Sequence, residues 1–250
     1  KNDLSDETLE YLATELRKYW GLGLGPISNL TLLLEKKGFL INRLKLNQDK
    51  IDAFSTWMSG RPFIFLCSDK NSSVRSRFDL AHELTHMIIH KNVKKNDLQN
   101  ASKLREIERQ ANYFAGAFLL PRESFGAEVM SSSLDHFITL KKRWKVSIAA
   151  MITRCEQLKI LSDNQIIYLN KQLSLRGMRK REPLDDEIRP ETPEVFKQAV
   201  NLIIENSICS PARIVDALAL NPIEIEEQFN LDTGILRTEG KVIPLKLKKE

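Results

Sequence analysis

Hydrophobic residues recur at helical spacing along most of this 250-residue chain, with one interruption in its first third. In residues 6–20 and in most of the chain after Ser73, apolar side chains lie three and four positions apart, as in amphipathic helices. Between these regions the spacing changes to the short alternating or continuous apolar runs that are typical of strands. The predicted strands cover residues 39–46, 51–58 and 62–67. The pattern therefore predicts an α+β, mainly helical protein with a small antiparallel sheet of about three strands.

Besides the helix at residues 6–20, the same spacing predicts a second helix before the strands and several after them. These helices cover about residues 27–37, 73–91, 102–120, 134–144 and 147–160, a segment reaching residue 175, and residues 193–206 and 211–220. A last short strand is predicted at 242–247. Residues 177–194 contain three prolines and many charges, which is typical of a linker. We therefore expect three regions: a first module in residues 1–130, a basic helical segment in 131–180, and a small C-terminal helical region in 190–250.

The composition is that of a soluble globular protein, with 42% hydrophobic residues, 28% charged residues and a net charge of +5. No stretch approaches the roughly 18 consecutive apolar residues of a membrane span, so we expect no membrane association. The chain starts with charged residues and shows no signal-peptide pattern. Its three cysteines lie far apart and predict neither a disulfide framework nor a C-x-x-C zinc site. Together these features predict a cytoplasmic protein.

The positive charge is concentrated in residues 141–182, which hold 11 Lys or Arg against 3 Asp or Glu, a net charge of +8. Within this region, residues 134–144 and 148–158 are predicted to form two helices joined by the short turn Lys145-Val146-Ser147. A helix-turn-helix with a basic surface is a common DNA-binding arrangement, so DNA contact through residues 141–182 is one hypothesis. The alternative is that these helices pack against the first module and leave a solvated basic face.

One candidate site stands out: the sequence His82-Glu83-Leu84-Thr85-His86 is an H-E-x-x-H motif inside a predicted helix. Residues four apart lie on one face of a helix, so both imidazoles can reach one metal ion. Glu83 is rotated by about 100° from His82, which suits its carboxylate to hold a water beside the ion rather than to complete the ligand set. That is the general-base position of a metallohydrolase. The alternative is a pair of surface histidines on an amphipathic helix.

The third ligand has to come from elsewhere in the chain. His90 lies about 12 Å along the helix from His82, which is too far for both to bind one ion. Its two possible roles are to orient neighbouring side chains or to interact with the negative end of the helix dipole. On the next helix, Glu108 lies at the edge of the apolar stripe, whereas Glu106 and Tyr113 project to the opposite, solvated side. A carboxylate that faces the core is costly unless it is paired. Glu108 is therefore the expected third ligand, with a salt bridge as the alternative.

Two motifs carry a family resemblance. The first is His82-Glu83-Leu84-Thr85-His86-x-x-Ile89-His90, and the second is Glu108-x-x-Ala111-Asn112-x-Phe114-Ala115-x-x-x-Leu119-Leu120-Pro121. Their combination resembles the ImmA/IrrE metallopeptidases, which are cytoplasmic, gluzincin-like proteins of bacteria and their mobile elements. The resemblance covers about residues 60–125. It departs from the usual motif at Thr85, where the family has Gly, a small change that we expect to be tolerated.

The resemblance implies that His82, His86 and Glu108 bind Zn²⁺, with Mn²⁺ as the alternative ion, and that Glu83 is the catalytic base of a zincin-like endopeptidase module. It also implies a protein substrate, a helix-turn-helix repressor of the xenobiotic-response-element type, whose cleavage relieves repression of stress or mobile-element genes. His136 is a candidate for the side chain that stabilises the oxyanion formed during hydrolysis. The strand at 62–67 is a candidate edge for binding an extended substrate.

Two other functions remain open at this point. The chain could be a non-catalytic DNA-binding or protein-interaction module whose metal is structural or absent. A structural zinc site usually fills all four positions with Cys or His, and no fourth ligand is evident here. The chain could also be a latent protease in which residues 190–250 sense an activating signal.

Overall fold

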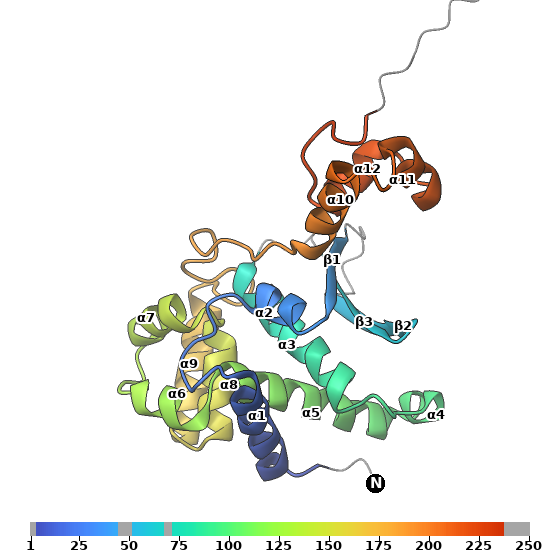
Figure 1. The fold of residues 1–250 in the computed structure, drawn as a ribbon. Helices are drawn as coiled ribbons and strands as arrows, with labels where there is room; N and C mark the ends of the chain where they lie inside the picture. Colours follow the sequence, from blue (N-terminus) through green and yellow to red (C-terminus); the bar gives the residue numbers. More distant parts are fainter. Residues whose placement is uncertain (1–3, 45–51, 68–71, 238–250) are drawn as a thin grey trace, which may run out of the picture. The chain divides into compact units, whose positions relative to one another are not determined.

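The computed structural model describes residues 4–44, 52–67 and 72–237 (Figure 1). The chain divides into two compact units, residues 1–192 and residues 193–250. All of the candidate site residues lie in the first unit. The α+β, mainly helical architecture is confirmed, and helices form most of the described residues. Among the described helices, none combines the length and apolar character that crossing a membrane requires.

The centre of the first unit is a pair of long helices, α3 (Ser73–Ile88) and α5 (Ala101–Leu119), which pack against each other. Helix α1 (Asp6–Trp20) packs on α5, and the sheet packs on α3 (Figure 1). Leu80 and Leu84 of α3 and Phe114 and Phe118 of α5 are completely buried. Helix α5 begins at Ala101 because the Asn100 side chain accepts hydrogen bonds from the N–H groups of the first turn. The apolar stripes seen in the sequence therefore bring the two helices together.

The sheet has three strands, as predicted, but it is mixed rather than antiparallel. Its order is β1 (Leu40–Leu44), β3 (Arg61–Cys67), β2 (Ala53–Met58), with β1 parallel and β2 antiparallel to β3. The β2–β3 hairpin turns at Ser59 and Gly60, both with positive φ. The prediction of an all-antiparallel sheet was wrong because apolar alternation reports which face of a strand is buried, not which strand it pairs with. Strand β3, whose Ile64 and Leu66 are almost fully buried, takes the centre.

Three short helices of five to seven residues were not predicted, because helices of this length leave only a weak helical period in the sequence. They are α4 (Lys95–Gln99), α6 (Arg122–Glu128) and α12 (Pro222–Gln228). The other helices not yet described match predicted ones closely. They are α2 (Leu30–Lys36), α7 (Leu134–Trp144), α8 (Ile148–Gln157), α9 (Asp163–Leu175), α10 (Val195–Glu205) and α11 (Pro211–Leu218). The strand predicted at 242–247 lies outside the described residues.

Helices α7 and α8 form the predicted helix-turn-helix. Lys145 ends α7 in the left-handed conformation, and the Ser147 hydroxyl accepts a hydrogen bond from the N–H of Ala150 at the start of α8. The buried face of α8, with Ile148 and Met151, joins the core of the first unit. This pair of helices is therefore a packed part of the unit.

The predicted linker has no regular secondary structure, but part of it is firmly docked on the first unit. We call residues 182–191 the acidic strap. The Lys141 ammonium, completely buried, lies 2.8 Å from Glu182 and 2.6 Å from Asp185. Glu182 also accepts hydrogen bonds from the N–H groups of Ile148 and Ala149, at the start of α8. At the other end of the strap, Glu191 pairs with Arg77 of α3.

The second unit has a small core of its own. Helices α10, α11 and α12 enclose Val200, Ile214 and Ile225. The Glu226 carboxylate accepts hydrogen bonds from the N–H groups of Gly234 and Leu236, which secures the loop after α12.

Candidate metal centre

Helix α3 presents the two histidines of the H-E-x-x-H motif on one face. The other faces of α3 pack against the sheet and against the hydrophobic core of the first unit, where Ala81 and Leu84 are completely buried. His82 and His86 lie one turn apart, and their Nε2 atoms are 2.9 Å from each other. The side chains of both histidines are mostly buried but reach a hollow of about 420 Å³, which Glu83, Glu108 and Asn112 also line.

Helix α5 brings the third candidate ligand to the same point. Glu108 Oε2 lies 3.1 Å from His82 Nε2, and Glu108 Oε1 lies 3.7 Å from His86 Nε2. One ligand atom from each of the three residues lies within 4.8 Å of the other two. Two ligands of a tetrahedral zinc ion are about 3.3 Å apart when the metal–ligand bonds are 2.0–2.1 Å. The separations in this cluster fall on both sides of that value, so the donor set fits one divalent ion.

Each histidine has a hydrogen-bond partner on its other ring nitrogen. His82 Nδ1 is 3.1 Å from the Asn112 carbonyl oxygen, which can only accept, so Nδ1 carries the proton. His90 Nε2 donates in the same way to Gln110 Oε1, at 3.1 Å. His90 Nδ1 is then an acceptor for the Nδ1–H of His86, at 2.9 Å. Both ligand histidines therefore keep the Nε2 lone pair free to face an ion.

His90 could orient its neighbours or interact with the end of the helix. Its hydrogen bond with His86 favours the first of these roles. We expect His90→Ala to lower zinc affinity about 10- to 100-fold, the usual effect of losing such an outer partner. Competition with a chromogenic zinc chelator measures the change. His136→Ala is the matched control, since His136 bonds the Glu128 carbonyl and the Met130 N–H. Equal affinities in the two variants would show that His90 does not orient His86.

Glu83 is a buried carboxylate beside the ligands. Its Oε2 accepts a 2.6 Å hydrogen bond from the Ser55 hydroxyl of β2. Burial raises the pKa of Glu83, and the Ser55 hydrogen bond offsets only part of this effect. A carboxylate with a raised pKa accepts a proton more readily, which suits a general base.

The ligand residues influence one another's protonation when no ion is present. Burial and the nearby His82 lower the pKa of His86 to about 4. Burial also acts to lower the pKa of His82, but the hydrogen bond and charge of Glu108 outweigh it, so the pKa of His82 is raised. The same hydrogen bond lowers the pKa of Glu108. His86 is therefore neutral and Glu108 charged near neutral pH, the forms that bind a metal.

Three expectations about neighbouring residues need correction. Tyr113 does project away from Glu108, but α1 covers that side of α5, so Tyr113 is 3% exposed and its hydroxyl donates to Glu10. His136 binds backbone groups of its own segment and does not line the hollow. The 62–67 strand is not an edge, because β3 pairs on both sides and β2 is the outer strand beside Glu83.

Three residues near the cluster, Ser55, Gln110 and Asn112, were not predicted to take part in the site. Asn112 could have been found, since it lies four residues after Glu108 on the same helical face. Gln110 and Ser55 carried no such signal, because their roles depend on how α5 and β2 pack against α3.

Three comparisons relate this chain to known proteins. Residues 34–156 match the profile of the IrrE N-terminal-like domain of peptidase family M78. A search of curated proteins gives no match. Among solved structures, a Mycobacterium tuberculosis transcriptional regulator is similar, with a TM-score of 0.45 and 18% identity, over 63% of this chain and 48% of that one. The chain thus spans about half the length of that regulator. The matched residues include the sheet, the H-E-x-x-H helix and Glu108, so residues 34–156 are an IrrE N-terminal-like domain of the kind found in the ImmA/IrrE family.

Proposed function

We propose that this chain is a metal-dependent endopeptidase that cleaves a helix-turn-helix repressor of the xenobiotic-response-element type. The observation that carries the proposal is the convergence of His82, His86 and Glu108, with the Glu83 carboxylate beside them. No Cys or His completes a fourth position among the described residues, which favours a catalytic over a structural ion. The match to a domain of a peptidase family supports the same reaction class.

The roles of the individual residues follow from their positions. Two imidazoles and one carboxylate suit Zn²⁺, with Mn²⁺ as the alternative. When bound, such an ion supplies Lewis-acid polarisation of the peptide carbonyl and of the attacking water. Glu83 accepts the proton of that water and transfers it to the leaving amine. Ser55 holds the Glu83 carboxylate in place, and Asn112 and His90 keep the ligand histidines in the tautomer that binds through Nε2.

The repressor substrate comes from the family resemblance. Its cleavage would relieve repression of stress or mobile-element genes in the cytoplasm, where such repressors bind DNA. A site recessed in a hollow of about 420 Å³ admits an extended segment of a partner protein more readily than a rigid surface.

The experiment that tests this function is metal-dependent cleavage. The zinc-loaded chain is incubated with helix-turn-helix repressors from the source organism, and products are identified by intact-mass spectrometry. We expect one repressor to be cut at a single site, with cleavage lost on chelation and recovered with one equivalent of zinc. Casein serves as a control for contaminating proteases. Intact repressors throughout would contradict the proposed function, and cleavage that survives chelation would contradict the metal mechanism.

DNA contact through residues 141–182 stays a second prediction, but not all of the cationic side chains counted in the sequence are accessible for it. Lys141 is buried against the acidic strap, and Arg154 is buried against Glu10. The first N–H groups of α8, which in helix-turn-helix proteins lie near the DNA, donate to Glu182. Any DNA contact would therefore depend on the exposed cations of this region, among them Lys142, Lys159, Lys171, Arg176 and Lys180.

A further inference from the structure

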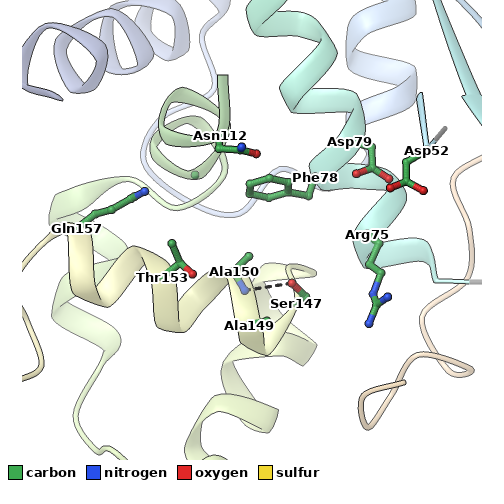
Figure 2. Close-up of a pocket in the computed structure, with 11 residues that line it drawn as sticks. Asp52, Arg75, Phe78, Asp79, Asn112, Ser147, Ala149, Ala150, Thr153 and Gln157 are labelled. Carbon is green, nitrogen blue, oxygen red and sulfur yellow. Dashed lines mark hydrogen bonds between the residues drawn. The ribbon is translucent and has the colours of Figure 1, made fainter. Parts of the chain in front are cut away.

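A second hollow, of about 450 Å³, adjoins the metal centre (Figure 2). It lies between α3, α5 and α8. Four residues, Asp52, Phe78, Asp79 and Asn112, line both this hollow and the one that holds the candidate ligands. A chain bound at the metal centre can therefore continue into the second hollow. We call this second hollow the α8 groove.

The wall formed by α8 consists of uncharged residues, and all of them except Gln157 are small. Ala149, Thr153 and Gln157 recur every four residues on one face of the helix, and Ala150 lies beside them. The Phe78 ring projects from α3 toward this face, and Asn112 lies on the α5 side (Figure 2). The charged residues Asp52, Arg75 and Asp79 gather at one end of the groove (Figure 2).

Helix α8 is firmly held in this position. The acidic strap accepts its first N–H groups through Glu182. On its buried side, Arg154 makes two hydrogen bonds with Glu10 of α1, at 2.6 and 2.7 Å, and a third with the Leu120 carbonyl. The groove is thus a preformed space between fixed helices, and binding into it requires little reorganisation.

We propose that the α8 groove is a specificity subsite that receives a large, uncharged, apolar side chain of the protein substrate, next to the cleaved bond's position at the metal centre. The inference rests on the proposed endopeptidase function. Phe78, Ala149 and Ala150 offer an apolar contact surface, and the amides of Asn112 and Gln157 and the Thr153 hydroxyl can bond the substrate backbone. A charged side chain in the middle of the groove would lose water without finding an opposite charge. The volume lies in the range of ligand pockets.

Hydroxamates that anchor on the metal test the groove without requiring turnover. Acetohydroxamate, which reaches only the ion, checks that the zinc-loaded site binds this group. Two peptidyl hydroxamates carry a leucine on the amino side or on the carboxyl side of the anchor, and each has a glycine counterpart. Affinities are measured by isothermal titration calorimetry. On one side of the anchor, leucine should bind about 10- to 100-fold more tightly than glycine, the gain expected for burying one such side chain.

Three variants of α8 introduce a larger side chain, two of them inside the groove and one outside it. Thr153→Trp and Ala150→Leu fill the groove from α8, whereas Glu156→Trp puts the same indole on an exposed position of the same helix. We expect the leucine preference to vanish in the first two variants and to persist in Glu156→Trp.

The outcomes separate this inference from the proposed function. Failure of acetohydroxamate to bind the wild type would contradict the metal site and the proposed function, and with them the groove. Acetohydroxamate binding without any leucine preference, or a preference that persists in Thr153→Trp and Ala150→Leu, would overturn the groove alone.

Discussion

Replacing Glu83 with Gln should leave one metal ion per chain and slow hydrolysis of the repressor substrate by about 10²- to 10⁴-fold, the usual contribution of a general base. Glutamine has nearly the same shape as glutamate and can still accept the hydrogen bond from Ser55. Its amide cannot accept the proton of an attacking water. The three expected ligands are untouched, so binding of the ion should persist. Elemental analysis gives the metal content, and the rate of product formation gives the activity.

The variants His86→Ala and Glu108→Ala provide the contrast. Each removes one of three ligands and should lose most of the bound metal and all activity, whereas Glu83→Gln should lose activity alone. If Glu83→Gln also lost its metal, Glu83 would be a ligand rather than the base. Cleavage at the wild-type rate by Glu83→Gln would show that the proton leaves by another route.

The second large effect concerns stability. Lys141→Met should lower the free energy of unfolding by about 3–5 kcal/mol, because it leaves the carboxylates of Glu182 and Asp185 buried without their cation. Urea denaturation followed by circular dichroism measures the change. The neighbouring Lys142→Met is the matched control, since Lys142 is exposed and its loss should change stability by about 0.5 kcal/mol or less.

A double variant tests the cause of that loss. Adding Glu182→Gln to Lys141→Met removes one of the two buried negative charges and should restore part of the stability. If Lys141→Met unfolded like Lys142→Met, the strap would contribute no stability through this ion pair. If the double variant were no more stable than Lys141→Met, the loss would come from packing rather than from unpaired charge.

Local pattern was sufficient to predict most of the helices and the convergence of His82, His86 and Glu108. The spacing of His82 and His86 is a property of a single helix, so it could be predicted before the fold was known. Glu108 was selected over Glu106 for its place at the edge of the apolar stripe, and it does lie beside His82 and His86. Its side chain is 46% exposed, so burial was not what distinguishes it from Glu106. What distinguishes it is that its face of α5 turns toward α3.

The features that were missed depend on contacts between distant segments. A helical wheel gives the direction of Tyr113 but does not show that α1 covers it. The direction of β1 relative to β3 depends on the path of the chain between them, which alternation does not encode. The docking of residues 182–191 could not be predicted either, because prolines and acidic residues are equally common in loose linkers. In each case the missing information was which segment becomes the neighbour.

The hydrogen bonds behind His86 have a consequence that reaches the surface of the molecule. His86 donates to His90, which donates to Gln110, and the Gln110 amide donates to Glu106, which also accepts from Arg109. The three bonds from His86 to Glu106 all run in one direction, away from the metal centre. Turning the Gln110 amide around would direct its oxygen at the Glu106 carboxylate, and the two would repel each other. A partly exposed ion pair on the far side of α5 thus sets the polarity of the whole row, and with it the nitrogen that His86 offers to the ion.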